Sequence, residues 1–179
     1  MQLTNTQNRY GSINILLHWV MAILIIGMLA LGIYMTGLPN NALKLKLFGW
    51  HKEFGILVLM LVCVRIVWRI SNVLPSLPTA MPYWEQFAAR FVHWLFYLLM
   101  FAMPITGWLV TSAAGIGPSF FGLFVLPTLV APDEKLLHLF AFIHKWLGYG
   151  LIAIICGHVA AALKHHFINK DDVLRRIFS

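Results

Sequence analysis

Charged side chains are scarce in this chain, and their scarcity excludes the most common class of protein. Only 11% of the 179 residues are Asp, Glu, Lys or Arg, whereas 60% are hydrophobic. The mean hydropathy is +0.81. A soluble globular domain ordinarily has about 25% charged residues. The composition therefore predicts an integral membrane protein, folded as a single domain over residues 1–179.

Cysteine and acidic residues are also rare. Cys63 and Cys156 each fall in the middle of an apolar run, and the absence of a C-x-x-C-H motif excludes the usual covalent attachment of haem. Six acidic residues against 13 basic ones give a net charge of +7. The basic residues lie at the ends of apolar runs, where Lys and Arg anchor membrane helices, so we expect no nucleic-acid partner.

Long apolar runs are what the sequence does have. Four of them are near or above the ~20 residues that a membrane-spanning helix needs. The first is predicted to be a span and not a cleaved signal peptide, because its only basic flanking residue is Arg9 and no small-x-small cleavage pattern follows it. We expect an all-α, up-down-up-down four-helix bundle that crosses the membrane at Ile13–Thr36, Leu47–Ile70, Phe87–Ser112 and Ile143–His166.

An even number of spans places both termini on one side of the membrane, and the positive-inside rule predicts that this side is the cytoplasm. Eight basic residues are expected on the side of the termini: Arg9, Arg65, Arg69, Arg90, Lys164, Lys170, Arg175 and Arg176. Five are expected on the other side: Lys44, Lys46, Lys52, Lys135 and Lys145.

The connections between the runs also carry signals. Ser71–Pro82 has three prolines and is predicted to be an extended loop. The long connection over 113–135 is rich in Gly, Phe and Pro, and is expected to lie against the membrane surface. Pro132, followed by Asp133 and Glu134, is predicted to be the first residue of the last helix.

Histidines in the apolar runs are the strongest functional signal. His144 and His158 are 14 residues apart (144 to 158). In an α-helix this spacing puts them on one face, about 21 Å apart along the axis. Antiparallel packing then brings His51 to the level of His144, and His18 to the level of His158. An ionisable residue inside a membrane needs a partner and marks a functional site.

Two facing imidazoles in a bundle core suit a six-coordinate b-type haem, so we predict two haem sites, His51/His144 and His18/His158. The alternatives are interhelical hydrogen bonding and a zinc site. A closed zinc site wants four ligands around one point, which two separated pairs do not provide. His93 lies near the inner pair but is expected to serve packing or a backbone hydrogen bond.

Several neighbours of these histidines are secondary candidates. Gly55 and Gly148 each follow an outer-pair histidine by four residues and could let a flat macrocycle approach. The alternative for both is ordinary helix packing. Arg65 could pair with haem propionates, and His165 could touch a haem propionate or a quinone headgroup.

Two lysines stand beside the outer histidines in the sequence. Lys52 follows His51 and Lys145 follows His144. Their charges could steer a small anion to the outer haem by focused potential, or they could be ordinary lysines at helix ends.

At this point the chain resembles the bacterial cytochrome b561 family over nearly all of its 179 residues. The resemblance rests on the joint order and spacing of several short motifs. They are Arg9-Tyr10 with Leu17-His18-Trp19, His51-Lys52-Glu53-Phe54-Gly55 with Val64-Arg65 and Trp68-Arg69, and His144 with His158 and Ala161-Ala162-Leu163-Lys164-His165-His166-Phe167.

This resemblance implies a di-haem b-type protein of the bacterial cytoplasmic membrane, with axial ligands matching His18, His51, His144 and His158. It also implies transmembrane electron transfer, with ubiquinone as acceptor and superoxide as a periplasmic donor. A haem-bearing anchor subunit that serves a separate periplasmic or dehydrogenase partner is the alternative. A metal-ion transporter is a third class, and the internal repeats typical of transporters are missing here.

Overall fold

The computed structural model describes residues 2–78 and 81–178, and it is dominated by four long helices. Each predicted apolar run lies in one of them, so the predicted all-α fold is confirmed. The helices are longer than the predicted spans, because the spans were defined by apolar character and helical backbone continues into polar flanks. Their bounds are α1 Ser12–Gly37, α2 Ala42–Ile70, α3 Tyr83–Ala113 and α4 Glu134–Lys164.

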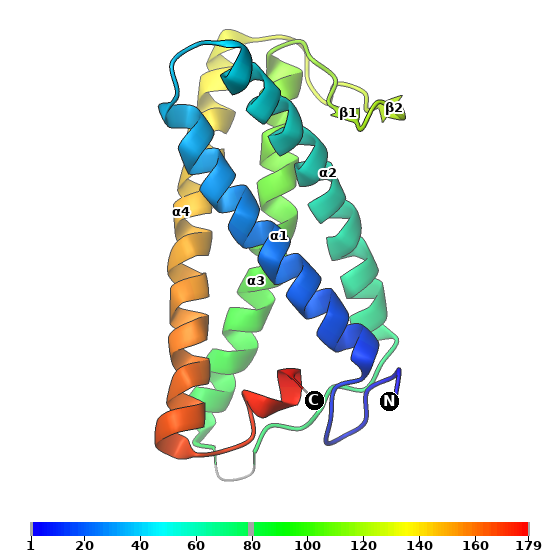
Figure 1. Cartoon of the computed structure of the whole chain (residues 1–179), viewed down its shortest axis with the longest axis vertical. Coiled ribbons are helices and arrows are strands. Elements are labelled where there is room, and N and C mark those ends of the chain that lie inside the picture. The colour runs from blue at the N-terminus through cyan, green and yellow to red at the C-terminus, as the bar shows by residue number, and fades with distance from the viewer. Residues whose placement is uncertain (1, 79–80, 179) are drawn as a thin grey trace.

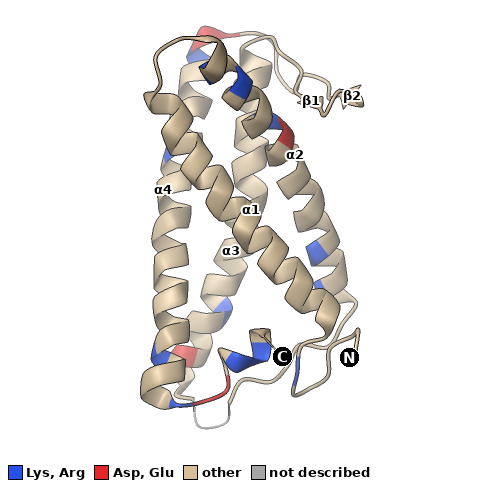
Figure 2. Ribbon diagram, viewed as in Figure 1, with Lys and Arg blue, Asp and Glu red and all other residues tan. Residues whose placement is uncertain are grey.

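The helices run up, down, up and down, so that both termini lie at one end of the bundle (Figure 1). We call this the termini end and the other the far end. In the described part of the chain, α1, α3 and α4 are long and apolar enough to cross a membrane. Charged residues interrupt α2 at both ends, Lys52 and Glu53 on one side and Arg65 and Arg69 on the other. Figure 2 shows these charges towards the ends of the helix.

Large apolar side chains face outward on every helix. Ile23, Ile70, Trp94 and Phe142 each expose more than 60% of their surface. Exposed apolar area on this scale is foreign to a water-soluble bundle and marks a surface that faces lipid or a partner. The chain is therefore built with its apolar side chains towards the bilayer, as the composition predicts.

The buried core joins three of the four helices. Met21 of α1, Val58 and Val62 of α2, and Met100 of α3 form its centre. No α4 residue belongs to this cluster in the described part of the chain. Helix α4 packs its backbone closely against α3, whereas α1 and α2 make no comparably close approach to it. Space for side chains thus remains between α4 and the pair α1–α2.

The last helix begins two residues later than the sequence suggested. Asp133 is the N-cap, and its carboxylate accepts a hydrogen bond from the backbone N–H of Leu136 at 2.9 Å. A side-chain cap satisfies a free N–H more directly than proline at the first helical position does. The prediction that Pro132 is the first helical residue is therefore wrong, since it precedes the cap.

The long connection contains a small hairpin that the sequence analysis did not anticipate. Strands β1 Ser119–Phe120 and β2 Phe124–Val125 pair in antiparallel fashion. The hairpin projects sideways from the far end, on the side of α2 (Figure 1). The Phe121 ring contacts that of Phe54, with 5.3 Å between centroids, so the hairpin is fixed to α2.

The termini end is closed by three segments that are far apart in the sequence. Arg176 donates to the backbone carbonyl of Ser76 at 2.6 Å, and the indole of Trp19 donates to that of Ile177 at 2.9 Å. In the 71–82 connection, residues 71–78 form no helix or strand, and residues 79–80 lie outside the described ones. The contacts hold the C-terminal residues under the bundle.

Candidate functional site

One spacing recurs in all four helices and defines two layers. Each helix carries two polar or glycine positions 14 residues apart: 18 to 32, 51 to 65, 93 to 107 and 144 to 158. Fourteen residues correspond to about 21 Å of helix rise on one face. The far layer consists of Gly32, His51, Gly107 and His144, and the near layer, closer to the termini end, consists of His18, Arg65, His93 and His158.

The far layer brings two histidines together against two glycines. The ring centroids of His51 and His144 are 6.1 Å apart, and their planes meet at 83°. A Cβ on Gly32 would lie 3.3 Å from Cε1 of His51, and one on Gly107 would lie 3.2 Å from Cε1 of His144. Both distances are shorter than ordinary van der Waals contact. Glycine at these positions therefore makes room for the imidazoles.

Hydrogen bonds fix the orientation of one far-layer ring. His144 Nδ1 lies 3.1 Å from the carbonyl oxygen of Met103 and 3.0 Å from the hydroxyl of Thr106. A carbonyl only accepts, so the Nδ1–H donates and Nε2 keeps its lone pair. By contrast, Nδ1 of His51 is buried without a hydrogen-bond partner among the described residues.

The near layer is more polar. The ring centroids of His18 and His158 are 6.5 Å apart, and that of His93 is 5.8 Å from His158. The guanidinium of Arg65 lies 3.4 Å from His18 Nδ1 and donates to the hydroxyl of Tyr97, also at 3.4 Å. The near layer thus holds three imidazoles and one permanent cation.

Both histidine pairs fit a haem. With a metal–imidazole bond of about 2 Å on each side, two rings on one ion have centroids about 6 Å apart, which both pairs match. Each pair joins α4 to α1 or α2, the helices that do not pack closely on it. No cluster of three or more His, Cys, Asp or Glu able to hold a metal ion occurs among the described residues, so a closed zinc site is disfavoured.

The secondary candidates have less crowded surroundings. A Cβ on Gly55 would meet Met28 at 3.9 Å, and one on Gly148 would meet Met103 at 3.6 Å, both ordinary contacts. Lys52 is partly exposed and Lys145 is exposed. The close approaches to the rings occur instead at Gly32 and Gly107, which the sequence analysis missed. The signal that could have found them is the repeated 14-residue spacing.

His165 is part of a separate buried cluster at the termini end. It is 9% exposed and begins a π-helix, His165–Asn169, that continues α4. Its Nδ1 lies 2.6 Å from a carboxylate oxygen of Asp171, and its Nε2 lies 3.6 Å from one of Glu85. Lys164 pairs with the other oxygen of Glu85 at 2.6 Å. The imidazole therefore lies between two carboxylates.

The Tyr10 phenol also lies near basic side chains at this end. Burial raises the pKa of Tyr10, and the opposing effect of Arg69, Arg176 and Arg65 is smaller. The phenol therefore stays protonated at neutral pH. Several cations thus gather beside the near layer.

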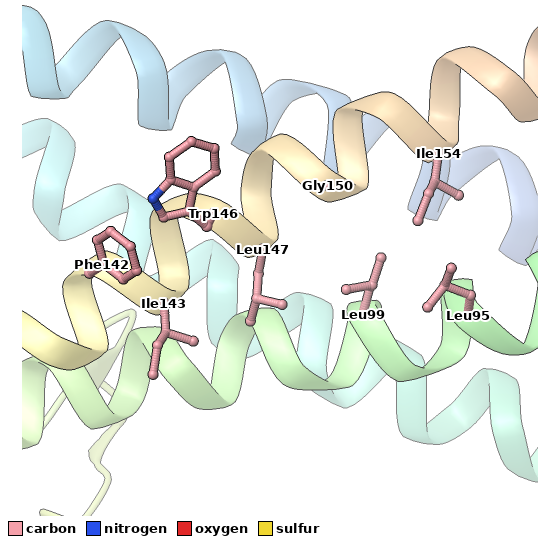
Figure 3. Close-up of a pocket in the computed structure, with 8 residues that line it drawn as sticks. All are labelled: Leu95, Leu99, Phe142, Ile143, Trp146, Leu147, Gly150 and Ile154. Atoms are coloured by element: carbon pink, nitrogen blue, oxygen red, sulfur yellow. The ribbon is translucent and has the colours of Figure 1, made fainter.

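A shallow apolar groove of about 370 Å³ lies between α3 and α4. Figure 3 shows side chains of both helices along it, including Leu99, Trp146 and Leu147. None of the paired histidines lines it, so it is separate from the two layers.

Comparison with known proteins identifies the family to which this arrangement belongs. The family model described as prokaryotic cytochrome b561 matches residues 9–179. The chain belongs to the prokaryotic cytochrome b561 family. The resemblance seen in the sequence motifs is thereby confirmed. As a member, the chain is a bacterial membrane protein of electron transfer, an oxidoreductase whose family implies b-type haem.

Three curated relatives cover nearly the whole chain. Cytochrome b561 homolog 2 of Escherichia coli K12 is 38% identical over 185 residues, with 99% of this chain and 95% of the relative covered. Cytochrome b561 homolog 1 of the same strain is 32% identical, with 95% and 97% covered. A probable superoxide oxidase, CybB of Yersinia pestis, is 27% identical, with 94% and 95% covered.

Proposed function

We propose that this cytochrome b561 holds two haems b, one in each layer, and passes electrons across the membrane from a donor at the far end to ubiquinone at the termini end. His51 and His144 would ligate one iron, and His18 and His158 the other. Haem supplies one-electron redox chemistry that no amino-acid side chain here provides. The single observation that carries the proposal is the pair of 6.1 Å and 6.5 Å imidazole separations, one in each layer.

Superoxide is the donor that we propose for the far end. It is a small anion, and Lys52 and Lys145 supply positive charge beside the far-layer histidines in the sequence. Charged side chains of one sign around a site raise the local concentration of the opposite ion. A relative from Yersinia pestis named as a probable superoxide oxidase lends further support.

At the termini end we assign roles to Arg65 and His165. Ligation of iron through Nε2 of His18 places a proton on Nδ1, so the Arg65 guanidinium must find another acceptor, and a haem propionate provides one. Reduction of one ubiquinone to ubiquinol takes up two electrons and two protons. His165, placed between two carboxylates, is suited to deliver those protons to the quinone headgroup.

We further propose that the termini end faces the cytoplasm of the bacterium and that the bundle crosses the inner membrane. The eight basic residues expected on the side of the termini, against five on the other, support this orientation. It places the donor site in the periplasm, and surrounding lipid covers the apolar outer faces of the helices.

The proposal is tested by counting haems and following their reduction. Purified protein should contain two haems per chain, and His51→Ala and His158→Ala should each remove one and leave the other low-spin. A pulse of superoxide should then reduce the wild-type haem within the mixing time of a rapid-kinetics instrument. One haem per chain in the wild type, or no reduction by superoxide, would contradict the corresponding part of the proposal.

The far-end hairpin favours a second candidate, an electron-carrying subunit that serves a periplasmic protein. Leu123 and Val125 at its tip are 77% and 67% exposed, which suits a protein partner as well as lipid. Under this candidate the purified chain keeps both haems, but superoxide does not reduce them unless the partner is added. The same rapid-mixing experiment therefore separates the two functions.

A further inference from the structure

The two layers differ at the positions that the paired histidines do not occupy. In the far layer these positions are Gly32 and Gly107, which bring no polar group. In the near layer the equivalent positions, 14 residues away on the same helices α2 and α3, hold Arg65 and His93. Two haems with the same kind of axial ligand would therefore have different surroundings.

Arg65 is the largest difference between the layers. Its guanidinium is charged at every relevant pH and lies 3.4 Å from His18 Nδ1. Among the ion pairs of the described residues, the carboxylates near this end pair with Lys164, His165 and Arg176, and none pairs with Arg65. An uncompensated cation in a medium of low dielectric constant favours the state with one more electron.

The far layer has the opposite bias. His144 donates its Nδ1–H towards the Met103 carbonyl and the Thr106 hydroxyl. A hydrogen bond of this kind makes the other ring nitrogen a stronger ligand. A stronger ligand stabilises the oxidised iron and lowers its reduction potential. Lys145 is exposed and Lys52 partly so, and solvent therefore screens their charges more than that of Arg65.

From these two differences we infer that the haem of the near layer has the higher reduction potential, and that this difference drives electrons from the far end to the termini end. The inference rests on the ligand sets of the proposed function. It adds a property that those ligands alone do not provide, since both pairs are bis-imidazole. Arg65 is, in this view, a positioning and tuning residue for the near-layer haem.

Redox titration of purified protein, followed by absorbance, tests the inference. His51→Ala leaves the near-layer haem, and His18→Ala leaves the far-layer haem. We expect the midpoint potential that remains in His51→Ala to be the higher of the two. The reverse order would overturn the inference, and this comparison does not require any Arg65 variant to fold.

The contribution of Arg65 is tested separately. Arg65→Met should shift the higher midpoint potential downwards and leave the lower one in place, and Arg65→Lys should restore most of the shift, because it keeps the charge. Arg90→Gln, which removes an exposed cation at the same end, is the matched control and should change neither potential. An unchanged higher potential in a folded, haem-replete Arg65→Met protein would remove Arg65 from the explanation.

Failure of the ligand assignment gives a different result from failure of this inference. If His51→Ala or His18→Ala keeps both haems, the proposed ligands are wrong. If each variant loses one haem and the potentials are equal or reversed, the ligands stand and only the direction of the gradient is wrong.

Discussion

At the scale of the residue, glycine decides where an imidazole ring can lie. Gly32 and Gly107 face the rings of His51 and His144 so closely that an added Cβ would displace them. Glycine in a membrane helix is most often explained by helix packing. Here two glycines on α1 and α3 instead accommodate a side chain from the helix next to them. The ring positions, and therefore any metal between them, depend on this missing Cβ.

Alanine at position 107 should disturb the far-layer site and leave the near-layer site intact. The added methyl would lie 3.2 Å from Cε1 of His144, so the ring must move away from the position that faces His51. We expect the haem content of Gly107→Ala to fall towards half of the wild-type value, measured as haem per chain. Gly150→Ala is the matched control, because a Cβ there meets nothing within 4 Å. Full haem content and an unaltered spectrum in Gly107→Ala would contradict the role given to this glycine.

At the scale of the element, the end of α4 is more than a helix terminus. The helix continues as a π-helical turn, and Lys170 follows with φ 55° before the chain reverses. This geometry carries Asp171 back to His165, while Glu85 at the start of α3 reaches the other side of the ring. Three segments thus converge on one buried imidazole. π-Helical turns occur often at functional sites.

Replacing His165 should slow the quinone half-reaction selectively. If the imidazole delivers protons, His165→Ala should lower the rate of quinone reduction by roughly 100-fold, because general acid catalysis contributes on this scale. Reduction of the haems by the donor should keep its wild-type rate. His138→Ala is the control, since that histidine is exposed at the far end.

A merely structural role of His165 has a different signature. It would slow both half-reactions together or lower haem content. Asp171→Asn gives a second reading: with the carboxylate beside His165 removed, the pH dependence of quinone reduction should change while haem content does not. An unchanged pH profile would indicate that the Asp171–His165 contact only holds the C-terminal segment.

At the scale of the whole molecule, the arrangement of helices separates two reactive ends. The three-helix core of α1, α2 and α3 leaves α4 apart from α1 and α2, and the histidines bridge these gaps at two levels. About 21 Å of helix separates the levels. Electron transfer across most of a ~30 Å hydrocarbon core is the natural use of such a spacing.

Fusion reporters should establish which end faces the cytoplasm. A fluorescent protein fused after Ser179 should fluoresce, and alkaline phosphatase fused at the same point should be inactive. Alkaline phosphatase fused after Asn40, in the connection between α1 and α2, should be active, because that connection lies at the far end. The opposite pattern would place the termini in the periplasm and reverse the assignment of donor and acceptor ends.

The sequence by itself determined the class of protein, the four helices and the depth at which each histidine lies. Composition, the length of apolar runs and a rise of 1.5 Å per residue are local properties, and they need no knowledge of packing. The resemblance to the cytochrome b561 family came from the same local motifs.

Only the tertiary structure decided which side chains surround the rings. The contacts of Gly32, Gly107 and Arg65 with histidines on other helices depend on helix rotation and spacing, and no local rule fixes these. The hairpin of the long connection and the carboxylates on His165 likewise arise from segments distant in sequence. Depth follows from counting along a helix, but the partner of a side chain follows from how helices meet.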